Sequence, residues 1–403
     1  MKKTAQRGNM VIAQSGGPTM VINQSLIGAV MAARDSDAIG KIYGARHGIA
    51  GILNEDFIDL RKETVRTLEA IAQTPSSALG SVRQKPSDED CEKIFEVLKK
   101  RDVRYFFYIG GNDSAETVQI VNQAARRAKF DLACFHIPKT IDNDLRNNDH
   151  SPGFGSAARF VAMAFMGDDL DNRALRGVKI NIVMGRHAGF LTAASALARQ
   201  RPDDGPHLIY LPERPFLIEN FVSDIRQMIE KHGRCVVAVS EGICDADGTP
   251  IVAKLAADVE TDSHGNVQLS GSGALGDLLA QEVRNRAGVS RVRADTFGYL
   301  QRSFPGIASE TDAAEARAVG AVAVKTALEG QTRSGSIAIV REPGKRYRVS
   351  YRCIQLRAVA RDTKHMPAKF ISRSGNDVTQ AFIDYASPLV GKLPPIAHFA
   401  GKA

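Results

Sequence analysis

Short apolar runs alternate with helical segments along most of the chain. At residues 10–35 an apolar run leads into the turn SGGP and then into a segment whose apolar residues recur at helical spacing. All or part of this pattern returns at 103–129, 130–144, 180–200, 207–213 and 234–242. Strands that alternate with helices indicate parallel sheets, and continuous apolar strands indicate helices on both faces. The sequence therefore predicts an α/β protein with doubly wound, mainly parallel sheets.

The pattern changes in the later part of the chain. Residues 246–272, with DG and HGN turns, are typical of a hairpin-like insert. The segment after Arg333 predicts more antiparallel strand, followed by a polar C-terminal tail. Within it, GKRYRVSYR at 344–352 alternates basic with apolar or aromatic residues, which fits a half-exposed strand or a nucleic-acid-binding stretch. We favour the strand.

The length of the chain predicts two domains. At 403 residues the chain exceeds the size at which one hydrophobic core stops growing. With 43% hydrophobic and 24% charged residues it has an ordinary globular composition, which argues against disorder. We predict one domain at 1–150, completed by about 301–345. The second is predicted at 151–300 and completed by about 346–403.

Charge and cysteine content narrow the partners and the compartment. The formal net charge of +8 suits an anionic partner, such as a phosphorylated metabolite, a nucleic acid or an acidic membrane surface. Five cysteines without CxxC spacing predict neither a disulfide framework nor a zinc ribbon. Polar residues interrupt the N-terminal apolar run before a signal-peptide core could form, and no apolar segment reaches spanning length. We expect a cytoplasmic protein.

Loops whose residues could bind a ligand or catalyse a reaction follow three of the predicted strands. The loops at 15–18 and 110–114 are glycine-rich, and HIPKTIDND at 136–144 is rich in carboxylates. Ligands of parallel α/β sheets gather outside the carboxyl ends of the strands. Glycine loops there let backbone N–H groups approach an anion. Neither loop has the P-loop or dinucleotide pattern, and each by itself could be an ordinary tight turn.

Asp113 and Lys139 refine this hypothesis. A carboxylate inside an anion-binding loop repels a nucleotide's phosphates, and a neighbouring lysine can compensate for it. Together the two residues favour a small, highly charged anion that is bound through lysine and metal. Taken separately, they could also be a helix-capping aspartate and a surface lysine.

Seven motifs in order resemble those of the phosphofructokinase family: SGGP, GSVRQKP, GGNDS, PKTIDND, MGRHAG, SEG and YLQRSF. The resemblance runs from about Met10 to about Ala316. It is similar in detail to the pyrophosphate-dependent branch, because Asp113 and Lys139 stand where ATP-using members have glycines. It implies the phosphofructokinase fold of two Rossmann-like domains. The first would bind the phosphoryl donor and the second the sugar phosphate.

The resemblance implies a reaction and a role for each candidate residue. The reaction is reversible phosphoryl transfer from pyrophosphate to the C1 hydroxyl of fructose 6-phosphate. Asp142 would be the general base, Thr140 would hold the hydroxyl or the phosphoryl group, and Lys139 would stabilise developing charge. The implied pyrophosphate-binding residues are Gly16, Gly17, Arg83, Gly111, Asp113, Ser114 and Lys139. Besides Thr140 and Asp142, the implied sugar-phosphate residues are Met184, Gly185, Arg186, Glu241, Arg293, Tyr299 and Arg302.

The family pattern also implies Mg²⁺ and a homodimer or homotetramer with sites completed between subunits, with no nucleic-acid or membrane partner. Asn112 departs from it, because an aspartate is usual there. An amide oxygen can ligate magnesium but supplies no charge, so Asn112 and Asp144 are the metal candidates, with Asp113 nearby. The competing hypotheses are an ATP-dependent 6-phosphofructokinase, a kinase of broader range that also accepts sedoheptulose 7-phosphate, and a non-catalytic regulatory subunit.

Overall fold

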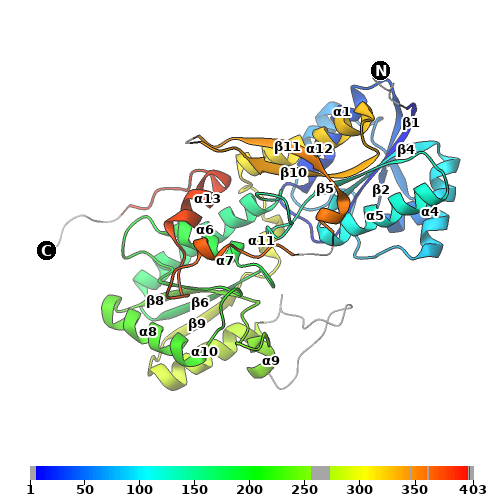
Figure 1. Cartoon of the computed structure of the whole chain (residues 1–403). Helices are drawn as coiled ribbons and strands as arrows, with labels where there is room; N and C mark the ends of the chain where they lie inside the picture. The colour runs from blue at the N-terminus through cyan, green and yellow to red at the C-terminus, as the bar shows by residue number, and fades with distance from the viewer. Residues whose placement is uncertain (1–5, 256–272, 345, 361–362, 398, 400–403) are drawn as a thin grey trace. The chain divides into compact units, whose positions relative to one another are not determined.

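The chain forms two compact units. The computed structural model describes residues 6–255, 273–344, 346–360, 363–397 and 399 (Figure 1). Unit 1 comprises Met1–Ser156 and Arg302–Lys364, and unit 2 comprises Ala157–Gln301 and His365–Ala403. Residues 346–364 thus lie in unit 1, whereas the sequence assigned them to the second domain. The physical reason is the antiparallel pairing of β11 (Val349–Ile354) with β10 (Ser334–Arg341), which keeps this segment on the first sheet.

Unit 1 is built on a seven-stranded sheet in the order β11-β10-β5-β4-β1-β2-β3. Its other strands are β1 (Gly8–Gln14), β2 (Ile39–Ala45), β3 (Phe57–Asp59), β4 (Val103–Gly110) and β5 (Ala133–Pro138). Neighbouring strands run parallel from β10 to β2, and the two edge strands, β3 and β11, run antiparallel. The predicted mainly parallel sheet is confirmed, and the basic stretch at 344–352 leads into an edge strand.

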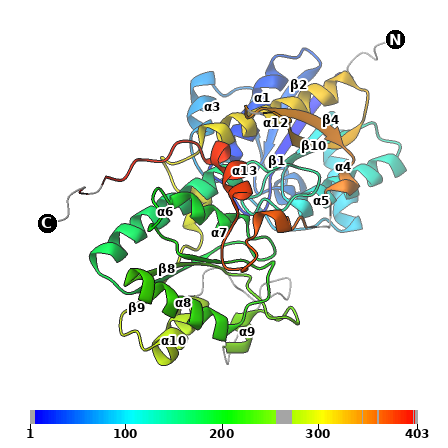
Figure 2. The same cartoon turned by 60° about the vertical axis from the view of Figure 1, so that its left-hand side comes forward.

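Helices cover both faces of this sheet (Figures 1 and 2). The helical segments are α1 (Ile22–Arg34), α2 (Ile49–Leu53), α3 (Val65–Ala72), α4 (Asp88–Lys100), α5 (Asn112–Arg127), α12 (Glu310–Glu329) and the 3-10 turn η2 (Leu356–Ala358). One core joins the strands to α1, α3 and α12, and the other joins them to α2, α4 and α5. The aromatic run of β4 explains its continuous apolar pattern: Tyr105 and Phe107 pack into the first core, and Phe106 and Tyr108 into the second.

Unit 2 contains a four-stranded sheet, all parallel, in the order β7-β8-β6-β9. The strands are β6 (Val178–Val183), β7 (Leu208–Tyr210), β8 (Cys235–Ser240) and β9 (Val292–Thr296). The helical segments that lie in unit 2 are α7 (Phe190–Ala194), η1 (Ser195–Ala198), α8 (Ile218–His232), α9 (Ile251–Leu255), α10 (Ala274–Ala287), η3 (Ala368–Phe370) and α13 (Gln380–Val390). Two more cross the boundary between the units: α6 (Phe154–Ala174) begins in unit 1, and α11 (Leu300–Ser303) ends in it. A single apolar core joins the strands to α8, α9 and α10. In the part of the chain that the structure describes, no helix is both long and apolar enough to span a lipid bilayer.

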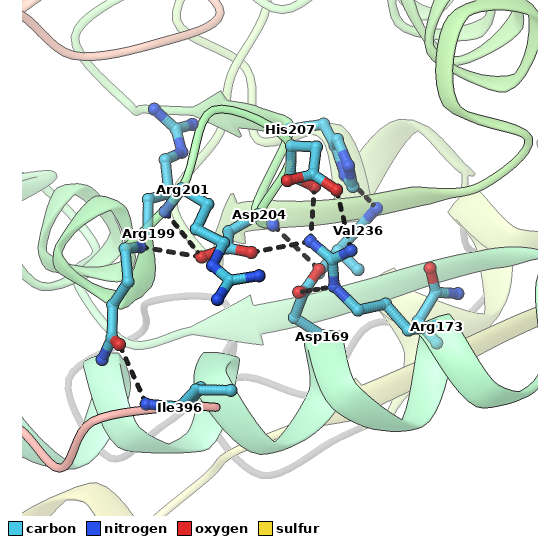
Figure 3. A network of polar contacts seen from close by, with 12 residues as sticks. Asp169, Arg173, Arg199, Arg201, Asp204, His207, Val236 and Ile396 are labelled. Carbon is cyan, nitrogen blue, oxygen red and sulfur yellow. Dashed lines mark hydrogen bonds and ion pairs between the residues drawn. The ribbon is translucent and has the colours of Figure 1, made fainter. Parts of the chain in front are cut away.

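Buried charges stabilise unit 2 between α6 and the loop before β7 (Figure 3). Asp169 accepts hydrogen bonds from the buried Arg234 at 2.5 Å, from Arg173 at 2.9 Å and from the Gly205 N–H at 2.8 Å. Burial raises the pKa of Asp169, but the bonds from the two arginines outweigh it, and the net effect lowers that pKa. The network is a structural element, because each of its charges already has a protein partner.

The C-terminal tail and the predicted insert at 246–272 are the remaining parts of the later chain. The C-terminal tail is not simply polar, because α13 buries Phe382, Leu389 and Val390, and Phe382 contacts the ring of Phe370 at 5.7 Å between centroids. These apolar residues follow a polar stretch, which hid their helical spacing. Of the predicted insert at 246–272, residues 256–272 lie outside the described residues. The described part forms a bridge between Cys244 and Pro250 and then α9.

Candidate active site

The candidate loops of unit 1 lie where the direction of strand order reverses. From β1 the chain proceeds to β2 on one side, and to β4, β5 and β10 on the other. The loops after β1, β4 and β5 therefore begin at neighbouring positions along one edge of the sheet. Such a reversal opens a crevice at the carboxyl ends of the strands. The structure thus brings together the residues that the sequence singled out after three separate strands.

The first two loops are joined to each other. The Ser15 and Ser114 hydroxyl oxygens are 2.9 Å apart, and both residues are buried. Gly16 has a φ of +74°, a left-handed conformation that costs an L-residue free energy. The Gly16 N–H donates to the Val82 carbonyl at 3.1 Å, and the Ser81 hydroxyl donates to the Gly16 carbonyl at 2.5 Å. The GSVR segment thereby holds the SGGP turn in place.

Lys139 extends from the end of β5 into this turn. It is 4% exposed, and its Nζ donates to the Gly17 carbonyl at 2.5 Å. A methyl group on Gly17 would lie 3.2 Å from the guanidinium carbon of Arg302, so glycine leaves room for the arginine. Burial, together with the positive charges of Arg302 and Arg83, lowers the pKa of Lys139 to about 8, although Asp142 and Asp144 oppose the effect.

These charges define a site for an anion. Lys139, Arg302 and Arg83 are close enough for each arginine to disfavour the lysine's charged form, and two carboxylates offset them only in part. Burying an ammonium among like charges costs free energy unless an anion joins them. The group of cations beside Gly16 and Gly17 is therefore suited to a small, multiply charged anion.

The carboxylate loop after Lys139 is internally hydrogen-bonded. The Thr140 hydroxyl donates to Asp144 Oδ1 at 3.0 Å and accepts the Asp142 N–H at 3.1 Å. Thr140 also bridges to Gly153 in parallel fashion, which closes the loop at its base. Asp142 and Asp144 are both half-buried. The loop thus holds two carboxylates beside a buried lysine, a combination suited to accepting a proton and stabilising negative charge.

Asp113 lies in the first turn of α5, where the helix N-terminus favours a carboxylate. Its side chain is 73% exposed and 3.6 Å from Lys85 Nζ, which also pairs with Glu116 at 2.7 Å. Asn112 Oδ1 accepts the Asp113 N–H at 2.9 Å. Gly111 is the N-cap residue of the same helix, which places it at the mouth of this loop.

The oxygen atoms near these loops suit a hard cation such as Mg²⁺, which prefers carboxylate and amide oxygens. Asp144 and Asp142 belong to one hydrogen-bonded loop, and Asn112 begins the neighbouring helix. Within the described residues no three His, Cys, Asp or Glu side chains form a cluster that would hold a metal by themselves. The donor set therefore fits a magnesium ion that takes its remaining ligands from water or phosphate oxygens.

The second group of candidates lies at the carboxyl ends of β6 and β8 in unit 2. Glu241 Oε1 accepts the Gly185 N–H at 3.3 Å, and the Ser240 hydroxyl donates to the Gly185 carbonyl at 2.7 Å. The Met184 N–H donates to Gln301 Oε1 at 3.2 Å. This turn is therefore fixed from three directions, with Glu241, Met184 and Gly185 in one compact group.

Other sugar-phosphate candidates have different surroundings. Arg186 follows the same turn, and its carbonyl lies against Gly242. Tyr299 is 52% exposed after β9. Arg293 pairs in register with Lys179, near the start of β6, so the structure does not bring it to the turn after that strand. Arg302 belongs to unit 1, beside Gly17.

Sequence reasoning assigned no role to several residues that build these loops. Ser15, Ser81, Lys85, Ser240 and Gln301 all lie inside the quoted motifs, yet their partners are distant in sequence. For Ser15 and Ser240 the position at a strand end was the available signal, whereas Ser81, Lys85 and Gln301 lie outside strand ends. That signal could not reveal which backbone groups they would bond.

The arrangement defines a class of protein: an α/β protein of two units, with a group of cations and paired carboxylates at the carboxyl ends of parallel strands. The family model described as phosphofructokinase matches residues 9–327. The chain belongs to the phosphofructokinase family.

Individual relatives are similar over nearly the whole chain. A pyrophosphate–fructose 6-phosphate 1-phosphotransferase of Rhodospirillum rubrum is 57% identical, covering 97% of this chain and 96% of its own. A protein of the same name from Xanthomonas campestris is 42% identical, with 97% and 93% covered. The crystal structure of a pyrophosphate-dependent phosphofructokinase from Marinobacter aquaeolei superposes with a TM-score of 0.85 at 37% identity, covering 97% of this chain and 94% of that one. The fold inferred from the motifs is thus confirmed.

Proposed function

We propose that this protein is an enzyme that transfers a phosphoryl group from pyrophosphate to the C1 hydroxyl of fructose 6-phosphate, giving fructose 1,6-bisphosphate and phosphate. The observation that carries the proposal is the group of three cations beside the Gly16–Gly17 turn: buried Lys139, half-buried Arg302 and exposed Arg83. The relative with that activity in its name, 57% identical over 97% of this chain, supports the same substrates. The energy of the phosphoanhydride bond in pyrophosphate is close to that of the phosphate ester formed in the product. We therefore expect the reaction to run in both directions.

We assign the donor to unit 1. Lys139 would pair with phosphoryl oxygens, and the Gly17 N–H and the N–H groups at the start of α5 would bind the remaining oxygens. Asp113 would exclude a nucleotide by the repulsion between its carboxylate and an additional phosphate. From its place beside Gly17, we assign Arg302 to the pyrophosphate pocket rather than to the sugar phosphate.

For the transfer itself, Asp142 would accept the proton of the C1 hydroxyl as the oxygen attacks phosphorus. Thr140 would orient the attacking or transferring group, and its bond to Asp144 would keep that carboxylate in place. Lys139 would stabilise negative charge on the leaving phosphate. A magnesium ion, held by Asp144 and Asn112, would supply charge neutralisation on the phosphoryl oxygens when bound.

We assign the sugar phosphate to the turn of unit 2. Glu241 would accept hydrogen bonds from sugar hydroxyls, and Arg186 would bind the 6-phosphate with Tyr299. Arg293 is the weakest member of this set because of its register with Lys179. A homodimer or homotetramer and a cytoplasmic location, where sugar phosphates are available, complete the proposal.

Initial rates with purified protein, Mg²⁺ and fructose 6-phosphate test this function, with pyrophosphate and ATP compared as donors. We expect turnover with pyrophosphate that Asp142→Ala abolishes. Turnover with ATP alone would instead support an ATP-dependent 6-phosphofructokinase. Absence of turnover with either donor would favour a regulatory subunit. Sedoheptulose 7-phosphate as the acceptor tests the breadth of the sugar site.

A further inference from the structure

The segment that follows the carboxylate loop, residues 147–149, is held by residues that lie beyond the family match. That match ends at residue 327. The Asp149 N–H donates to the Ile339 carbonyl at 2.9 Å, and the Ile339 N–H donates to Asn148 Oδ1 at 3.0 Å. Asn147 Nδ2 donates to the Ala358 carbonyl at 2.7 Å. The loop that carries the proposed base is therefore fixed on one side by β10 and by η2.

Lys364 is the last residue of this wall, and it contacts the loop through a charged side chain, as Arg341 of β10 does at Asp149 Oδ2, 3.1 Å away. Its Nζ lies 3.0 Å from both the Asn148 and the Asp149 carbonyl oxygens, and 3.4 Å from Asn143 Oδ1. Its backbone N–H donates to the Asp144 carbonyl at 2.7 Å. One residue therefore connects two parts of the loop that are several positions apart.

Asn143 transmits this connection to the carboxylates. It is fully buried, has a φ of +58°, and stands between Asp142 and Asp144. Its Oδ1 also accepts the Ser151 N–H at 3.1 Å. A non-glycine residue in the left-handed region persists where surrounding contacts hold it. Lys364 supplies one of those contacts, at a residue that lies directly between the two carboxylates.

The surroundings of the ammonium show that it is more than a surface charge. The Nζ of Lys364 lies within 3.0 Å of two backbone carbonyl oxygens and is part-buried. An ammonium removed from water costs free energy unless acceptors surround it, and backbone carbonyls do so here. An apolar side chain of the same length would fill the space but leave these carbonyls without that donor.

We propose that Lys364 is a positioning residue, whose ammonium joins the turn at Asn143 to the carbonyls of Asn148 and Asp149 and thereby orients Asp142 and Asp144 for phosphoryl transfer. The kinetic part of this inference rests on the proposed function. The structural part rests on the contacts alone. Lys364 lies in a segment beyond the family match, and none of the motifs assigns a role to that segment.

Lys364→Met tests the inference, with Lys369→Met as the matched control. Lys369 belongs to the same C-terminal part of the chain and lies exposed over the Phe370 ring at 5.2 Å. In Lys364→Met we expect kcat with pyrophosphate to fall about 10- to 100-fold, the range that a displaced catalytic group produces, with KM for both substrates changed less than about threefold. Amide hydrogen exchange should become at least about tenfold faster in peptides covering 140–153 and stay unchanged elsewhere. The control should match the wild type in both measurements.

Exchange in 140–153 that equals the wild type, or kcat within about twofold of it, would overturn the inference. A rise in KM without loss of kcat would equally contradict a positioning role. If Lys364→Met does not fold, Lys364→Gln, which keeps a donor, takes its place and should show a smaller change in the same direction. If the wild type turns over neither pyrophosphate nor ATP, the proposed function fails, and the exchange measurement still decides whether Lys364 orders the loop.

Discussion

Lys139→Met gives the sharpest prediction from the anion pocket. A fall in the lysine pKa from 10.5 to about 8 means that the folded, ligand-free protein disfavours the charged form. Each tenfold change in the acidity constant corresponds to about 1.4 kcal/mol, so the penalty at pH 7 is roughly 3 kcal/mol. Methionine has a similar length and no charge. It removes the penalty but also the hydrogen bond to the Gly17 carbonyl, which offsets about 1–2 kcal/mol.

The net expectation is that Lys139→Met stabilises the ligand-free protein by roughly 1–2 kcal/mol while it abolishes pyrophosphate turnover. For a domain of this size, that gain corresponds to a rise in Tm of about 2–8 °C. The folded-state pKa of Lys139 lies below its unfolded value. The penalty is therefore fully present below pH 8, and it disappears as pH rises towards 10.5. The advantage of Lys139→Met should shrink over the same interval.

Calorimetry at pH 7 and pH 10, with and without pyrophosphate, measures this directly. Pyrophosphate at about 100 times Kd should stabilise the wild type by roughly 2.7 kcal/mol and leave Lys139→Met unchanged, which reverses the order of the two Tm values. Lys99→Met, at the exposed end of α4, controls for loss of a lysine. A lower Tm for Lys139→Met without ligand at both pH values would refute the charge argument, because it would make Lys139 a stabilising residue.

Three further substitutions test separate parts of the structure. Gly16→Ala should destabilise the protein by about 1–2 kcal/mol in urea denaturation, because φ is +74° there; an unchanged midpoint would contradict this reading of the turn. Glu241→Gln keeps an acceptor for the Gly185 N–H but removes the charge. KM for fructose 6-phosphate should therefore rise about tenfold, while KM for pyrophosphate stays constant. A change in KM for pyrophosphate alone would assign Glu241 to the pyrophosphate site instead. Asp169→Asn leaves the buried Arg234 without its carboxylate and should cost about 3–5 kcal/mol, measured by thermal unfolding; a loss below about 1 kcal/mol would show that the network contributes little.

The pattern of apolar and polar residues predicted most of the fold, because burial of apolar residues is what stabilises each strand and helix. The continuous apolar run of β4 required two covered faces, and the structure has a core on each. The position of residues 346–364 could not be predicted in this way, because it depends on the pairing of β11 with β10 rather than on composition. The same holds for α13, whose Tyr385 ring packs against the ring of Phe190, far away in the sequence.

The candidate site was predictable where strand ends align. Gly16, Gly111 and Lys139 each follow a strand, and parallel pairing brings such positions to one edge. Register places Arg293 opposite Lys179, near the start of β6, so strand-end alignment does not account for its place in the predicted set. Lys364 carried no local signal, because its partners precede it by more than 200 residues.

Donor selectivity tests the central claim most directly. The measurement is the ratio of kcat/KM for pyrophosphate to that for ATP, in the wild type and in Asp113→Gly with Lys139→Gly. The account predicts a ratio well above one in the wild type, and a gain in ATP use together with a loss of pyrophosphate use in the double variant. A wild type that prefers ATP, or a double variant whose ATP use does not improve, would contradict it.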